Sequence, residues 1–150
     1  MTEMNSMEER SQQRTNPHFG EVHNAYFPFE EDPTRGKVRP VIVVSEAMVE
    51  LPNGKLVEKD SLTEEDLKTI DIQKIYHNAT KVTSRHRVYD EFDVLIDNWQ
   101  ESGLDHESTA RCAKTMALPI QNFRDFRGYL DIQDLQNVME SINKLLDSID

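Results

Sequence analysis

Seven side chains able to bind a phosphate group lie in two short windows of the sequence, and neither window contains an acidic residue. The windows span residues 35–39 and 81–87, and these side chains are Arg35, Lys37, Arg39, Lys81, Arg85, His86 and Arg87. A guanidinium group can hold two phosphate oxygens with parallel hydrogen bonds, which makes arginine well suited to this chemistry. Six of the chain's 17 Lys and Arg residues fall in these windows. The windows predict one positive site if they meet, and two separate solvated turns if they do not.

Short strands are expected to position both windows. Val41 to Val44 are uninterrupted β-branched residues, as is typical of a strand buried on both faces. Gly36 allows the preceding backbone to turn, and Pro40 suits the first position of a strand, where its missing N–H does no harm. We therefore expect the first window to be a loop that leads into this strand. The second window follows a strand expected at 75–84, so both windows should meet at strand ends of one sheet.

The remaining pattern predicts an α+β domain over residues 19–150, preceded by a disordered polar leader at 1–18. Further strands are expected at 20–27, 92–96 and 108–116. The segment 46–74 is interpreted as a surface excursion with a hairpin turn at Asn53-Gly54 and a short helix that begins after Thr63. Apolar residues recur every three or four positions over 132–149, which predicts an amphipathic helix. Asp131 is expected to cap it, with Asp134 in its first turn.

Composition excludes several classes of protein. A net charge of −11 argues against broad, non-specific nucleic-acid binding, so any polyanion must be held by a local patch. The single cysteine, Cys112, rules out an intramolecular disulfide, and with no apolar signal segment it points to the cytoplasm. No apolar run is long enough to cross a membrane. The five histidines are scattered without metal-ligand spacing, so we expect neither a metal nor a cofactor.

An ordered series of short motifs resembles the MazF/PemK family of type II toxin-antitoxin endoribonucleases. The series covers about residues 20–148 and consists of Gly20-Glu21-Val22, Ala25-Tyr26-Phe27-Pro28, residues 35–44, Val82-Thr83-Ser84, Trp99, Gly103-Leu104, Ser108, Arg111 and Phe126-Arg127-Gly128-Tyr129-Leu130. The resemblance implies a small, strongly curved antiparallel sheet that forms a partly closed SH3-like barrel with a C-terminal helix. The chain departs from compact members of the family in its longer 46–74 excursion and in its acidity.

The same resemblance implies the activity and the site. The family's catalytic arginine falls on Arg39 and its catalytic threonine on Thr83, while Ser84 and the other basic residues of the two windows would bind RNA. Members cleave single-stranded RNA without a metal and usually form homodimers, and a cognate antitoxin peptide blocks their RNA groove. A non-catalytic interaction module on this fold, either a degenerate toxin or a CcdB-like protein poison, is the alternative. CcdB-like proteins use a C-terminal tryptophan, whereas Trp99 is the only tryptophan of this chain.

General chemistry supports a metal-free reaction at such a site. The 2′-hydroxyl of RNA can attack the neighbouring phosphorus, which gives a cyclic phosphate and a free 5′-hydroxyl, and DNA lacks this nucleophile. The protein then needs to move protons and to stabilise the charge that develops on the phosphoryl oxygens. Arg39 and Thr83 can donate hydrogen bonds there, but neither is a base near neutral pH. His86 could act as the base if it lies within hydrogen-bond reach.

Overall fold

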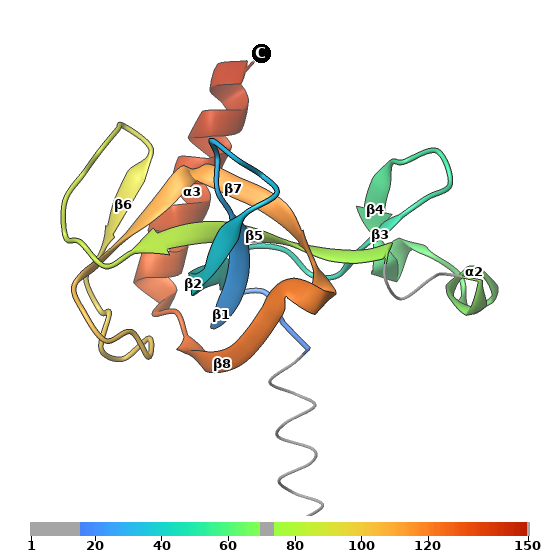
Figure 1. The fold of residues 1–150 in the computed structure, drawn as a ribbon, viewed down its shortest axis with the longest axis horizontal. Helices are drawn as coiled ribbons and strands as arrows, with labels where there is room; N and C mark the ends of the chain where they lie inside the picture. Colours follow the sequence, from blue (N-terminus) through green and yellow to red (C-terminus); the bar gives the residue numbers. More distant parts are fainter. Residues whose placement is uncertain (1–15, 70–73, 150) are drawn as a thin grey trace, which may run out of the picture.

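One strongly curved antiparallel sheet and a long C-terminal helix make up the body of the protein (Figure 1). The computed structural model describes residues 16–69 and 74–149, so most of the leader expected at 1–18 lies outside the described residues. In this part of the chain the strands are β1 (Glu21–Pro28), β2 (Gly36–Val43), β3 (Met48–Glu50), β4 (Leu56–Glu58), β5 (Ile75–Thr83), β6 (Asp93–Ile96), β7 (Ser108–Pro119) and β8 (Phe123–Tyr129). The helices are η1 (Lys59–Ser61), α2 (Glu64–Lys68), η3 (Ile120–Asn122) and α3 (Ile132–Ile149).

Strand β5 is the centre of the sheet because three other strands pair with it. Its first residues pair with β3 and its middle with β2, while β7 pairs along its other edge. The strand order is β4-β3-β5-β2-β1-β8, with β6 added beside β7. Among the described strands β4, β6 and β8 each have a single partner, so the sheet curves without closing. A partly closed, curved sheet is what the family resemblance implies.

Strand β2 is buried on both faces, as its run of β-branched residues predicts. Ile42 belongs to the core cluster that includes Val138 of α3, whereas Val41 and Val43 belong to a second cluster around Phe123. The structure corrects the expected start of this strand. β2 begins at Gly36 and not at the expected position 41, so Lys37 and Arg39 lie within the strand. Pairing with β1, which opposes Arg39 with Ala25, holds this segment extended although its sequence is not apolar.

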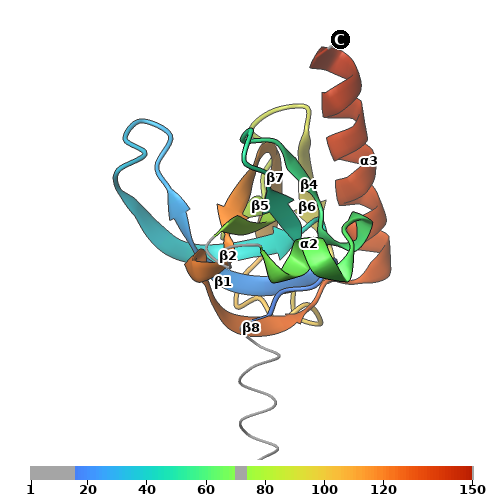
Figure 2. The same ribbon diagram turned by 90° about the vertical axis from the view of Figure 1, so that its right-hand side faces the viewer.

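The C-terminal helix α3 covers one face of the sheet and packs against β6 and β7 (Figures 1 and 2). It spans the range that its apolar periodicity predicts. Asp131 caps it, since its Oδ2 accepts hydrogen bonds from the backbone N–H groups of Gln133 and Asp134 at 3.0 and 3.3 Å. The Asp134 carboxylate does more than complement the helix dipole. It is fully buried and accepts hydrogen bonds from the N–H groups of Asp97 and Asn98.

The described part of the predicted excursion, residues 46–69, projects from the body (Figure 1). Strands β3 and β4 form a hairpin around Gly54, and α2 follows with Thr63 and Asp66 in a reciprocal capping box. A hairpin and a short helix are what the sequence predicts here. Within the described ranges, no helix has both the length and the apolar character needed to span a bilayer.

Two features of the core differ from a simple interpretation of the sequence. Strand β8 was not expected, and it pairs with β1 through two register shifts that disrupt a regular alternation of side chains. His23 and His77 are fully buried and flank Phe123, so they are core residues far from solvent. Burial lowers the pKa of His77. Cys112 is also buried, as expected for a small core residue, and burial raises the pKa of its thiol to about 11.

Candidate active site

A gap opens between β2 and β5 where their hydrogen-bonded ladder ends. The pairing register sets Val41 opposite Lys81, so one further step would set Pro40 opposite Val82 and the next Arg39 opposite Thr83. Backbone donors toward β5 come from even-numbered residues, since the N–H of Val44 donates to the Asn78 carbonyl at 2.9 Å. The donors of this series lie at every second residue, at positions 44, 42 and 40. Pro40 has no N–H to donate, so the hydrogen bond at that position is missing. The ladder therefore stops at Val41, and the two strands diverge.

A pocket of about 380 Å³ lies in this gap, and we call it the splay pocket. Its lining residues come from β2, from β5 and from the loop after β5, and they are Lys37, Val38, Arg39, Pro40, Val82, Thr83, Ser84, Arg85 and Tyr89. Arg39 and Thr83 thus share one pocket, although 44 positions separate them in the sequence. Divergence of two strands from a common register accounts for this placement.

Two polar atoms in the splay pocket have unused hydrogen-bonding capacity. Arg39 Nε and Thr83 Oγ1 are both inaccessible to solvent, and neither has a hydrogen-bond partner among the described residues. Buried polar atoms are normally paired, so each such exception calls for an explanation. Arg39 and Thr83 both line the splay pocket, so small rotations of their side chains would let the two groups hydrogen-bond to one oxyanion bound there.

A second pocket, of about 540 Å³, shares two lining residues of β2 with the splay pocket and is also basic. Lys37, Arg39 and Lys81 line it together with Lys114 of β7, and we call it the lysine pocket. Glu30, from the loop between β1 and β2, reaches across it and forms an ion pair with Lys114 at 2.5 Å. Because Lys37 and Arg39 line both pockets, the two form one basic track across β2.

The pKa values of the cations show that this track is crowded with positive charge. The pKa of Lys81 is lowered, chiefly by burial and further by the charges of Arg39, Arg111 and Lys114, while Glu30 acts in the opposite direction. Burial also lowers the pKa of the Arg39 guanidinium. A bound polyanion would relieve the repulsion between these groups, which favours anion binding at this place.

The structure brings together some of the residues that the sequence singles out and leaves others apart. Lys37, Arg39, Lys81, Thr83, Ser84 and Arg85 line one or both pockets. Arg35, His86 and Arg87 line neither of them. Arg35 lies in the turn that closes the β1–β2 connection, where its N–H donates to the Asp32 carbonyl. The exposed His86 is thus poorly placed to act as the base.

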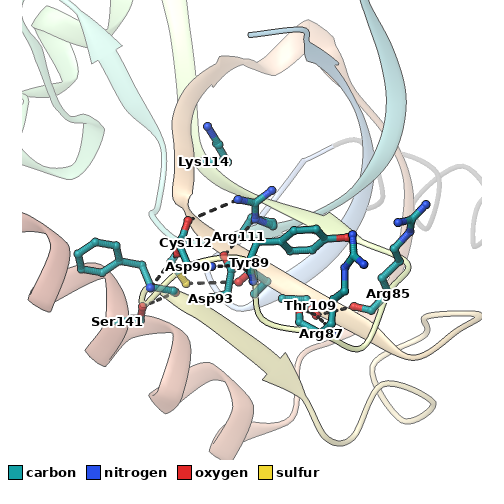
Figure 3. A network of polar contacts seen from close by, with 12 residues as sticks. Arg85, Arg87, Tyr89, Asp90, Asp93, Thr109, Arg111, Cys112, Lys114 and Ser141 are labelled. Carbon is teal, nitrogen blue, oxygen red and sulfur yellow. Dashed lines mark hydrogen bonds and ion pairs between the residues drawn. The ribbon is translucent and has the colours of Figure 1, made fainter.

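The sequence analysis missed Lys114 and the polar network around Tyr89 (Figure 3). Lys114 reaches the track because β7 carries three extra residues where its register with β5 shifts, so that Thr80 pairs with Thr115 and Lys81 with Arg111. No residue pattern in 108–116 marks this bulge. Within the described ranges, no group of three or more His, Cys, Asp and Glu side chains could hold a metal ion.

This combination of a curved antiparallel sheet and a C-terminal helix is the fold of the MazF toxins. MazF from Deinococcus radiodurans aligns with a TM-score of 0.57 and 17% identity, over 87% of this chain and 96% of that one. The Mycobacterium tuberculosis toxin MazF-mt6 aligns with a TM-score of 0.51 and 20% identity, over 85% and 96% of the two chains. A mycobacterial endoribonuclease in complex with its cognate antitoxin aligns with a TM-score of 0.55 and 11% identity, over 87% and 95%. No family model and no curated protein sequence matches the chain. The predicted fold is confirmed.

Proposed function

We propose that this protein is a metal-independent endoribonuclease toxin of a type II toxin-antitoxin system, with residues 19–150 as the toxin domain. The observation that carries the proposal is the splay pocket, where Arg39 Nε and Thr83 Oγ1 lie buried without a described partner. Support also comes from the fold shared with MazF toxins, whose solved structures include one named as an endoribonuclease bound to its cognate antitoxin. The proposed partners are single-stranded RNA, an antitoxin peptide and a second copy of the chain, in the cytoplasm.

In the proposed reaction, the scissile phosphodiester occupies the splay pocket and its neighbours follow the basic track. Arg39 and Thr83 donate hydrogen bonds to the phosphoryl oxygens, on which negative charge develops as the 2′-oxygen attacks phosphorus. The bond from phosphorus to the 5′-oxygen then breaks. The products are a 2′,3′-cyclic phosphate and a 5′-hydroxyl. The cations of the track supply the local positive charge that this acidic protein otherwise lacks.

Cleavage of single-stranded RNA by the purified protein in EDTA tests this function. We expect cleavage of RNA and none of a single-stranded DNA of the same sequence, because DNA has no 2′-hydroxyl. An RNA with one 2′-deoxy nucleotide at a mapped cleavage site should resist cleavage at that site only. Intact RNA over a wide range of protein concentration would instead favour a non-catalytic interaction module on this fold.

Replacing Thr83 by valine should slow cleavage by about 5–10-fold, because it removes one hydrogen bond from a neutral donor, worth about 1 kcal/mol. Valine matches the shape of threonine and leaves the β5 backbone paired with β7. The single-turnover rate at saturating protein measures the effect. Thr83→Ser keeps the hydroxyl and is the matched control, expected within about twofold of the unsubstituted protein. Equal rates for Thr83→Val and Thr83→Ser would show that the Thr83 hydroxyl takes no part in the reaction.

A further inference from the structure

Tyr89 lies at the edge of the splay pocket, with two guanidinium groups close to its ring (Figure 3). The central carbons of Arg87 and Arg111 each lie 4.5 Å from the centre of its ring. Arg111 is itself held by Asp93, from Nε to Oδ1 at 3.1 Å, and by Asp90 at 3.4 Å. The backbone N–H of Tyr89 donates to the other Asp93 oxygen at 2.7 Å. The backbone of Tyr89 is therefore held by Asp93 and its ring contacts two guanidinium groups, although the side chain remains exposed.

These contacts argue against the role that aromatic residues usually have in RNA binding. Base stacking needs an open ring face, but two guanidinium groups already lie over the Tyr89 ring. What remains available is the edge that carries the hydroxyl, and this edge lies toward Arg87 and Arg85 (Figure 3). The phenol oxygen is thus the part of Tyr89 that can take part in chemistry.

The splay pocket otherwise lacks a group suited to accept a proton. Among its described lining residues, the guanidinium groups are unsuited to accept a proton, and the alcohols of Thr83 and Ser84 are far too weakly acidic to supply an alkoxide base. A lysine could act as a base only in its neutral form, and the site would then lack a positive charge that the phosphate needs. A phenolate at Tyr89 would instead be stabilised by its arginine neighbours. The pKa of the Tyr89 phenol is lowered, first by a hydrogen bond from the Arg87 side chain and further by the charges of Arg87 and Arg85.

We propose that Tyr89 is the catalytic base of the RNA cleavage reaction. Its phenolate oxygen accepts the proton of the 2′-hydroxyl while the 2′-oxygen forms its bond to phosphorus. The bond from phosphorus to the 5′-oxygen breaks, and the leaving 5′-oxygen takes a proton from water. Tyr89 then returns its proton to the hydroxide that remains, so that no net change in the protein occurs. This inference rests on the proposed function and adds a residue for which no sequence motif of the chain provides a role.

The pH dependence of cleavage tests this role with a matched pair of variants. Tyr89→Phe removes only the hydroxyl and keeps the ring in contact with its two arginines. Tyr129→Phe makes the same change at an exposed tyrosine that packs on Phe126 and lines neither pocket. The unsubstituted protein and Tyr129→Phe should show single-turnover rates that rise about tenfold per pH unit and level off at the pKa of Tyr89. Tyr89→Phe should be slower by on the order of 10²-fold and should lose this inflection.

Two further measurements separate the base from a merely structural residue. Arg87→Gln removes the cation that hydrogen-bonds to the phenol, so the inflection should move to higher pH. The near-ultraviolet absorbance of phenolate should show one tyrosine that ionises below the ordinary range and is missing in Tyr89→Phe. An unchanged rate and pH profile in Tyr89→Phe would overturn the role of Tyr89 and leave the endoribonuclease proposal standing. A complete lack of cleavage by the unsubstituted protein would overturn both.

Discussion

Replacing Arg39 by alanine is expected to lower the rate of RNA cleavage by about 10²–10³-fold, the usual cost of losing a preorganised donor to a developing oxyanion. Arg39 lines both the splay pocket and the lysine pocket, and its Nε has no partner among the described residues. The guanidinium is therefore available for substrate and is not needed to hold the fold together. Thermal unfolding should change little, while the single-turnover cleavage rate should fall.

Arg35→Ala provides the matched control because it removes the same charge from an exposed residue of the adjacent turn. Arg35 lines neither pocket, so its loss should weaken RNA binding only through long-range attraction, which salt screens. Arg39→Lys keeps the charge but loses the planar fork and should recover only part of the rate. Similar cleavage rates for Arg39→Ala and Arg35→Ala would show that only the lost positive charge matters. They would contradict a specific catalytic role for Arg39.

Replacing Gly103 by alanine is expected to lower the free energy of unfolding by about 2–5 kcal/mol. Gly103 has φ +81°, a conformation that costs an L-residue roughly 1–2 kcal/mol. An added Cβ would also lie 2.2 Å from the Arg127 carbonyl oxygen, and relief of such overpacking costs typically about 1–3 kcal/mol more. Neither the added Cβ nor the Arg127 carbonyl oxygen can move away without a shift of the backbone. The Gly103 carbonyl also accepts a hydrogen bond from Arg127 Nε at 2.9 Å.

Gly54→Ala separates the two causes. Gly54 has φ +86°, but nothing lies within 4 Å of the position its Cβ would take. This variant should lose only the conformational part, about 1–2 kcal/mol. Urea unfolding followed by circular dichroism measures both variants on the same scale. Equal losses in Gly103→Ala and Gly54→Ala would contradict the close contact between the turn at Gly103 and β8.

The parts of the fold that the sequence predicted are those that local patterns encode. The apolar repeat of α3 and the β-branched run of Val41–Val43 record burial directly, since their side chains face the core at helical or strand spacing. Strand β8 has no such pattern, because its register shifts against β1 change which side chains face inward. The segment Gly36–Arg39 is a strand through pairing with β1, and that contact is not local in the sequence.

The candidate site was predictable only in part, because contacts between residues far apart in the sequence also create it. Resemblance to a toxin family, and not spacing, pointed to Arg39 and Thr83. Lys114 enters the basic track through a bulge in β7, and Tyr89 gains its setting from Arg111, 22 positions away in the sequence. Contacts of this kind arise from the register of paired strands, which a single sequence does not specify. Whether the residues of the two windows bind RNA stays a prediction.

A structure of the protein bound to a single-stranded RNA that carries a 2′-deoxy nucleotide at a mapped cleavage site would test the central claim most directly. The deoxy nucleotide removes the nucleophile and leaves the phosphodiester in place. We expect its phosphate between β2 and β5, within hydrogen-bond distance of the Arg39 guanidinium and the Thr83 hydroxyl. A cleavable strand seated on another face, with this gap unfilled, would contradict the account.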